Sequence, residues 1–193
     1  RGAINLSQGF PDFQAAPALF DAMDRHIRAG RNQYAPMAGM PELRQAIVDK
    51  VAALYGTCFD AESEVTVTAG ATQAIFTAIA AFVRPGDEVI VFEPVYDSYV
   101  PAIETVGGKP VYAQLQFPDY APDWAQVAQL ITPRTRMIIV NSPHNPTGSL
   151  LTAVDLEKLA ELVRGTDIVV LSDEVYEHIL FDGERHASVA GHG

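Results

Sequence analysis

The chain has 193 residues, 48% of them hydrophobic, so it can bury a substantial core as one domain or a large part of one. Its 13 Lys and Arg against 24 Asp and Glu give a formal net charge of −11, which disfavours binding to nucleic acid or to anionic membranes because both reward clustered basic residues. The single cysteine, Cys58, excludes an internal disulfide framework and favours a reducing compartment, so we expect a cytoplasmic protein. No apolar run approaches the roughly 20 residues that span a bilayer, and the N-terminus does not read as a signal peptide.

Apolar periodicity, with Gly and Pro as breakers, predicts regularly alternating helices and strands from Glu64 onward. Alternation of this kind predicts an α/β fold with a mostly parallel sheet and helices on both faces. Residues 1–40 look different and are expected to belong to another subdomain, followed by a domain over residues 41–193. The last helix is expected to be capped by Thr152, with Asp155 three residues on. Helices are expected over residues 17–30, 41–55, 70–83, 96–106, 124–131 and 152–164, and strands over residues 65–68, 88–92, 111–115, 137–140 and 168–171.

The most informative stretch covers residues 137–148, Met-Ile-Ile-Val-Asn-Ser-Pro-His-Asn-Pro-Thr-Gly. A β-branched run followed by prolines, asparagines and a glycine predicts a buried strand that delivers a rigid loop to the carboxyl end of the sheet. Open α/β sheets bind their ligands at that edge. Pro143 and Pro146 restrict the backbone, so Asn145 is presented with little conformational freedom. Taken alone, the segment also fits an ordinary strand-to-helix turn.

Two other predicted strands lead into residues that suit a ligand at the same edge. Ala69-Gly70-Ala71-Thr72-Gln73 runs directly into a helix, whose N-terminal N–H groups and positive dipole end suit a phosphate. Small residues there also allow tight strand–helix packing, and a dinucleotide or nucleoside triphosphate site lacks its GxGxxG or Walker fingerprint. Tyr96, after the next strand, offers a ring that stacks on a flat heteroaromatic ligand, or else it is a core tyrosine.

Asp173 lies just beyond an apolar strand, and a buried carboxylate is costly without a cation or several hydrogen bonds. No Lys or Arg nearby in the sequence offers itself, so the partner is a distant arginine or the protonated ring nitrogen of a ligand. Tyr176, three residues on, reaches the same site if a helical turn begins there. Metal binding by Asp173, Glu174 and His178 is the rival interpretation, but no His-x-x-x-His or Cys spacing supports it.

A phosphate cradle, a ring for stacking, an amide donor and a carboxylate for a ring nitrogen together describe a site for pyridoxal phosphate (PLP). The stretches that match one known family are residues 5–11, 32–34, 68–72, 86–89, 96–99, 141–148 and 172–176. Within them, Asn-Pro-Thr-Gly and Ser-Asp-Glu-Val-Tyr are highly specific in combination. Nearly the whole chain resembles the N-terminal half of class I/II aminotransferases of PLP fold type I. It is similar in particular to the bacterial methionine aminotransferase and kynurenine (glutamine) aminotransferase branch.

The resemblance implies a role for each matching residue. The catalytic residues would be Asp173, Tyr176 and Asn145, with Asp173 keeping the ring nitrogen protonated so that the ring acts as an electron sink. Asn145 and Tyr176 would bind the phenolic oxygen of the ring, Tyr96 would stack on the ring, and Tyr34 would reach the phosphate of the partner in a homodimer. The implied cofactor-binding set is Gly70, Ala71, Thr72, Tyr96, Asn145, Asp173, Tyr176 and Tyr34, and the implied substrate-binding set is Gly9, Phe10 and Asn145.

The same family binds its cofactor through a lysine, whereas this chain contains only Lys50, Lys109 and Lys158, none in the expected Ser-x-x-Lys context. We therefore expect that lysine, the arginine for the substrate carboxylate and the last sheet strands beyond Gly193, and no turnover from these 193 residues alone. Residues 1–40 would then be an arm and part of a small domain, and residues 41–193 the first part of the PLP-binding large domain.

The implied reaction moves an amino group between an amino acid of methionine, glutamine or aromatic type and a 2-oxo acid. Two alternatives stay open: a PLP-dependent carbon–sulfur β-lyase and a non-catalytic PLP-binding regulatory domain. Neither nucleic acid nor a membrane is expected as a partner, given the acidic balance of the chain.

Overall fold

The computed structural model describes residue 9 and residues 13–191. The chain divides into two compact units, Arg1–Met37 and Ala38–Gly193. The described part of the first unit contains α1 (Pro17–Arg28), which confirms a helix in the predicted place. Three of its apolar side chains lie at helical spacing and are each more than half exposed, at 54%, 55% and 56%: Leu19, Met23 and Ile27.

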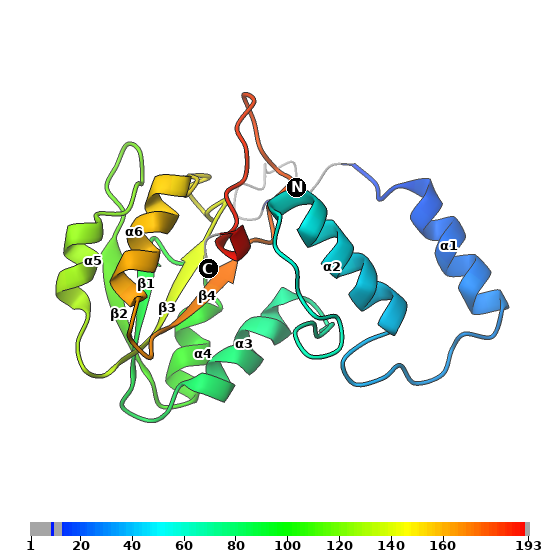
Figure 1. Cartoon of the computed structure of the whole chain (residues 1–193), viewed down its shortest axis with the longest axis horizontal. Helices are drawn as coiled ribbons and strands as arrows, with labels where there is room; N and C mark the ends of the chain where they lie inside the picture. Colours follow the sequence, from blue (N-terminus) through cyan, green and yellow to red (C-terminus); the bar gives the residue numbers. More distant parts are fainter. Residues whose placement is uncertain (1–8, 10–12, 192–193) are drawn as a thin grey trace, which may run out of the picture. The chain divides into compact units, whose positions relative to one another are not determined.

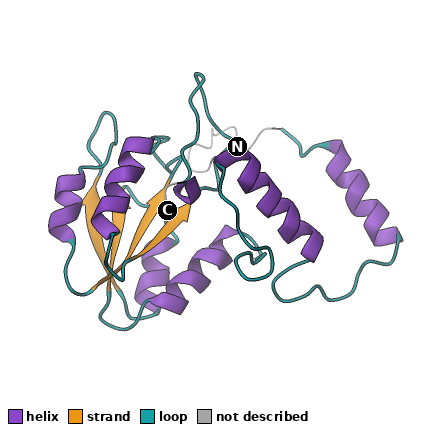
Figure 2. Ribbon diagram, viewed as in Figure 1, coloured by secondary structure: helices purple, strands orange, loops and turns teal. Residues whose placement is uncertain are grey.

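The second unit is built on a four-stranded parallel sheet in the order β2-β1-β3-β4. Its strands are drawn in orange in Figure 2. The α/β prediction with a parallel sheet is therefore confirmed. Each strand is five to seven residues long and is followed by a connection that crosses the carboxyl edge. The strands are β1 (Glu88–Glu93), β2 (Lys109–Gln114), β3 (Thr135–Asn141) and β4 (Val169–Asp173).

Helices cover both faces of this sheet, as predicted (Figure 1). Because successive side chains of a strand point to opposite faces, β1 and β3 feed two separate clusters of buried apolar residues. One cluster joins Val89, Val91, Met137 and Ile139 to α3 (Ala71–Phe82) and α4 (Tyr99–Thr105). The other joins Ile90, Phe92, Ile138 and Val140 to α5 (Trp124–Leu130) and α6 (Ala153–Val163).

Two helix boundaries follow from local sequence as expected. α2 (Pro41–Tyr55) begins with proline in its first turn and ends where Gly56 takes a left-handed conformation with φ 73°. At the start of α6, the backbone N–H of Thr152 donates to Asp155 Oδ2 (2.9 Å), and Thr152 Oγ1 accepts from the N–H of Asp155 (3.2 Å). This capping box fixes the far end of the loop that follows β3.

Two predictions are wrong in detail. Residues 65–68 form no strand: the Val67 N–H donates to the carbonyl of Ala38 (2.9 Å), and no ladder partner lies beside the segment in the part of the chain that the structure describes. A strand needs such a partner, and sequence pattern alone does not supply one. The helix predicted over residues 96–106 begins only at Tyr99, because residues 94–98 first turn the chain across the sheet edge. Among the described residues, no helix is both long and apolar enough to cross a membrane.

Candidate active site

A pocket of about 110 Å³ opens at the carboxyl edge of the sheet. Six residues singled out from the sequence line it, and they come from the start of α3, the β1–α4 connection, the β3–α6 loop and the turn after β4. These loops therefore meet at one edge of the sheet, as expected from the sequence. The lining consists of Ala71, Thr72, Ile75, Tyr96, Asn141, Asn145, Asp173, Val175 and Tyr176.

One wall of the pocket is the N-terminus of α3. Gly70 is the N-cap, with φ 84° and ψ 165°, a conformation that is essentially restricted to glycine. No side chain caps this helix, so no side-chain cap competes for the N–H groups of Ala71 and Thr72 at the positive end of the dipole. Gln73 Oε1 accepts from the N–H of Ala69 (2.6 Å) and fixes the entry turn. Gly70 itself does not line the pocket; it sets the direction in which the helix begins.

Opposite this helix lies Asp173, the last residue of β4, whose side chain is 9% exposed. Its Oδ2 accepts from the Tyr99 hydroxyl (2.7 Å) and its Oδ1 from the N–H of Val175 (3.2 Å). Both donors are neutral, and no ion pair joins Asp173 to a basic side chain within the described residues. The carboxylate is therefore oriented but not neutralised, and it is complementary to a cationic group placed in the pocket.

Tyr99 is a site residue whose role sequence reasoning missed. Burial, and secondly its hydrogen bond to Asp173, raise the pKa of the Tyr99 phenol well above its usual value, so the hydroxyl stays protonated and donates. Its ring meets that of Tyr96 edge to face, with centroids 5.5 Å apart. The available signal was the Tyr-x-x-Tyr spacing at a strand-to-helix connection, which places a second tyrosine beside the first.

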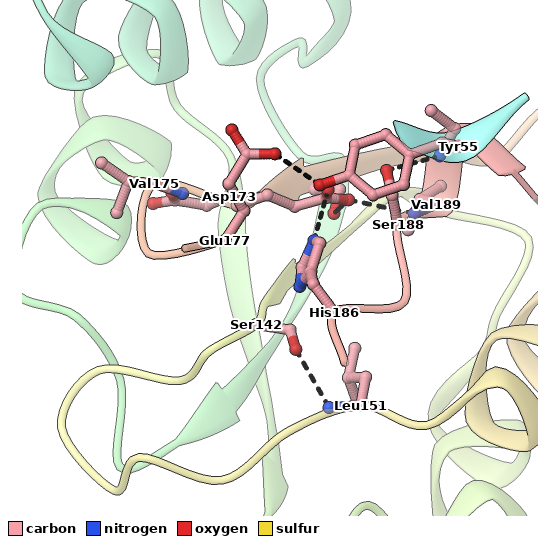
Figure 3. Close-up of polar contacts among 12 residues, drawn as sticks. Tyr55, Ser142, Leu151, Asp173, Val175, Glu177, His186, Ser188 and Val189 are labelled. Carbon is pink, nitrogen blue, oxygen red and sulfur yellow. Dashed lines mark hydrogen bonds and ion pairs between the residues drawn. The ribbon is translucent and has the colours of Figure 1, made fainter. Parts of the chain in front are cut away.

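The loop after β3 is held by its own polar groups. Asn141, also missed from the sequence as a site residue, accepts from the N–H of Asn145 through Oδ1 (2.7 Å) and donates through Nδ2 to the carbonyl of Asp173 (2.8 Å). It thereby ties the end of β4 to the loop that presents Asn145. Farther along, the N–H of Leu151 donates to Ser142 Oγ (3.0 Å; Figure 3). Burial lowers the pKa of His144, whose Nδ1 lies 2.8 Å from Thr147 Oγ1.

The other residues predicted for the site are Tyr176, Tyr34, Gly9 and Phe10. Tyr176 lines the pocket and its side chain is 36% exposed. Tyr34 belongs to the first unit and is fully exposed, and Gly9 is exposed. Phe10 lies outside the described residues. The roles of Tyr34, Gly9 and Phe10 therefore stay predictions.

Comparison with known proteins identifies the family. Residues 1–192 match the family model described as aminotransferase class I and II. The chain is 50% identical over 190 residues to the methionine aminotransferase of Escherichia coli, covering 98% of this chain and 49% of the relative. It is 45% identical to a probable N-succinyldiaminopimelate aminotransferase of Mycobacterium tuberculosis, over 98% of this chain and 48% of the relative, and 37% identical to kynurenine–oxoglutarate transaminase 1 of Rattus norvegicus, over 97% and 47%.

Solved structures agree with this assignment. The crystal structure of E. coli YbdL, described as having a methionine aminotransferase function, superposes with a TM-score of 0.95 at 50% identity, over 98% of this chain and 50% of that one. An aromatic aminotransferase from Pyrococcus horikoshii superposes with a TM-score of 0.92 at 37% identity, over 96% and 50%. The chain thus spans about half the length of the relatives that it matches. Class I/II aminotransferases use pyridoxal phosphate. This chain belongs to the class I and II aminotransferase family, as its motifs predicted.

Proposed function

We propose that the intact protein is a PLP-dependent aminotransferase that moves an amino group between an amino acid and a 2-oxo acid. The observation that carries this proposal is the buried Asp173 carboxylate, held by Tyr99 and Val175 without a cationic partner among the described residues. A protonated pyridine nitrogen would supply the missing positive charge. Family membership supports the same assignment.

The pocket residues fit the cofactor in four respects. Asp173 would bind the ring nitrogen, and Tyr96 would lie against the ring. Asn145 and Tyr176 would donate to the phenolic oxygen. The N-terminus of α3, set by Gly70, would hold the phosphate through the N–H groups of its first turn. The proposed cofactor-binding set is Gly70, Ala71, Thr72, Tyr96, Asn145, Asp173 and Tyr176.

When bound, pyridoxal phosphate supplies an electron sink for the carbanion formed at the substrate Cα. The protein contributes by favouring the protonated form of the ring nitrogen, which makes the ring a better electron acceptor. Asp173 would hold a proton on the ring nitrogen, and the Tyr99 hydroxyl and the Val175 N–H fix the orientation of its carboxylate. Asn141 fixes the backbone of Asn145, so the amide side chain meets the pocket in one direction.

Substrate preference is proposed from the relatives. The E. coli relative is named a methionine aminotransferase and the P. horikoshii neighbour an aromatic aminotransferase, which supports methionine or aromatic donors. A glutamine donor is proposed from the resemblance of the motifs alone. We further propose that Gly9 and Phe10 lie at the substrate, and that Tyr34 reaches the phosphate of a second subunit in a homodimer. In this scheme residues 1–40 form an arm and part of a small domain, and residues 41–193 begin the large domain. The single cysteine of the chain, Cys58, supports a cytoplasmic location.

The test is an amino-transfer assay on the intact protein with PLP, methionine as donor and a 2-oxo acid as acceptor. The proposal expects stoichiometric formation of the amino acid that corresponds to the acceptor. Release of ammonia and a 2-oxo acid without any acceptor would show a lyase instead. Absence of PLP binding by the wild-type protein would refute the proposal altogether.

A further inference from the structure

The turn after β4 carries Tyr176 into the pocket and is flanked by two glutamates that the proposed chemistry does not use. The N–H of Glu177 donates to the carbonyl of Glu174 (2.9 Å), and the N–H of Ile179 donates to that of Tyr176 (2.8 Å). Turns of this kind are short, so their direction depends on what holds their side chains. Both glutamates are held.

Glu174 accepts three hydrogen bonds from residues on either side of the turn. Its Oε1 accepts from Ser172 Oγ (2.7 Å) and from the N–H of Val189 (3.0 Å), and its Oε2 accepts from His186 Nε2 (2.8 Å). The Glu174 side chain is 19% exposed and that of His186 only 4%. A carboxylate only accepts, so His186 Nε2 carries the hydrogen. His186 Nδ1 is buried without a partner among the described residues, so a single hydrogen bond orients this ring.

Glu177 is held in the same region, on the other side of Tyr176. The Tyr55 hydroxyl donates to its Oε2 (2.5 Å), and Lys50 forms an ion pair with it. The rings of Tyr55 and His186 meet edge to face, with centroids 5.9 Å apart and planes at 69°. Figure 3 shows Tyr55 and His186 beside the turn that carries Glu177. The two restraints therefore adjoin each other.

We propose that Glu174 and His186 are positioning residues for the cofactor pocket. Adjacent residues of an extended chain face opposite ways, and here Asp173 faces Tyr99 while Glu174 faces His186. Holding Glu174 therefore fixes the rotation of the chain at the end of β4. That rotation decides whether Asp173 and Tyr176 both point into the pocket. This inference rests on the proposed use of pyridoxal phosphate.

The experiment compares two substitutions at His186 in the intact apoprotein, titrated with pyridoxal phosphate and followed by its visible absorbance. His186→Gln keeps an N–H donor near the position of Nε2, whereas His186→Ala removes it. Partners that orient a ligand-binding side chain are worth about 10- to 100-fold in affinity at metal sites, and we expect about tenfold weaker binding in His186→Ala. His186→Gln is expected to stay within about threefold of wild type.

Trp124→Phe is the matched control, because it also removes one side-chain hydrogen bond to a carboxylate. The bond runs from Trp124 Nε1 to Asp155 Oδ1 (2.9 Å) and joins α5 to α6. These helices cover the face of the sheet opposite to α3 and Tyr99. All affinities are measured at a temperature where far-ultraviolet circular dichroism matches wild type. If His186→Ala does not fold, Ser172→Ala replaces it; this variant removes one of three donors to Glu174 and should weaken binding by about threefold.

Selective loss of cofactor affinity at His186 or Ser172, with rescue by glutamine, supports the positioning role. Wild-type affinity in a folded His186→Ala or Ser172→Ala variant overturns it, as does an equal loss in Trp124→Phe. If the wild-type protein itself binds no pyridoxal phosphate, the proposed function fails and this inference fails with it. If the wild type binds the cofactor and the folded variants bind it equally well, only this inference fails.

Discussion

Replacing Asp173 with Asn removes the charge of the pocket carboxylate and keeps its shape. The fold should tolerate the change, because the Tyr99 hydroxyl can rotate to accept from the new amide while the amide oxygen still accepts from Val175. What is lost is the attraction for a protonated ring nitrogen. The side chain is 9% exposed, so water replaces little of that attraction.

The magnitude follows from the charge separation. Two unit charges about 4 Å apart attract each other by about 4 kcal/mol at an effective dielectric constant near 20. The amide dipole recovers part of this, leaving a loss of about 2–4 kcal/mol, which corresponds to about 30- to 1,000-fold in a rate or binding constant. We expect the rate constant of amino transfer in the intact protein, measured at saturating cofactor, to fall by a factor in this range.

Asp182→Asn is the control for Asp173→Asn. It makes the same chemical change at an exposed residue with φ 57°, a conformation that asparagine adopts readily. Its rate should match wild type. Transfer by Asp173→Asn within about threefold of wild type, with normal circular dichroism, would refute the assignment of Asp173 to the ring nitrogen.

The remaining predictions concern Tyr99, Gly70 and the lysines. The Tyr99 phenol has a raised pKa in the folded state, so its contribution to stability is complete below the unfolded value of about 10 and is lost as the pH rises above it. Tyr99→Phe should therefore flatten the alkaline loss of stability by up to about 1.4 kcal/mol per pH unit, measured as the urea midpoint of the apoprotein above pH 10, and an unchanged slope would contradict this. Gly70→Ala strains the N-cap conformation by about 1–3 kcal/mol and should weaken cofactor binding by about tenfold in an absorbance titration; wild-type affinity would show that the entry turn is not needed. The lysines of the 193-residue chain are Lys50, Lys109 and Lys158, and none of them lines the pocket. Borohydride reduction of this chain with pyridoxal phosphate should therefore label none of them. A pyridoxyl group found on any of them by mass spectrometry would contradict this.

Much of the pocket was predictable because parallel strands deliver their carboxyl ends to one edge. Asp173 ends β4, and Asn145 and Tyr176 follow β3 and β4 by a few residues, so locating the strands was enough to bring these residues together. Thr152 and Asp155 form the expected capping box because this motif depends only on residues close together in the sequence.

What the sequence did not yield depends on tertiary contacts. Tyr99 meets Asp173 across 74 positions of sequence, and the Tyr-x-x-Tyr spacing places it beside Tyr96 without indicating that distant contact. The β-branched segment over residues 65–68 has the composition of a strand but finds no ladder partner among the described residues, because strand pairing is decided by distant segments. The contacts of Glu174 with His186 and Val189 are likewise long-range.

The central claim is that Asp173 keeps a ring nitrogen protonated. Nitrogen-15 nuclear magnetic resonance of the intact protein, loaded with pyridoxal phosphate labelled at the ring nitrogen, measures that proton directly. The account predicts the chemical shift of a protonated pyridine in wild type and that of a neutral pyridine in Asp173→Asn. A neutral-pyridine shift in the wild-type protein at neutral pH would contradict it.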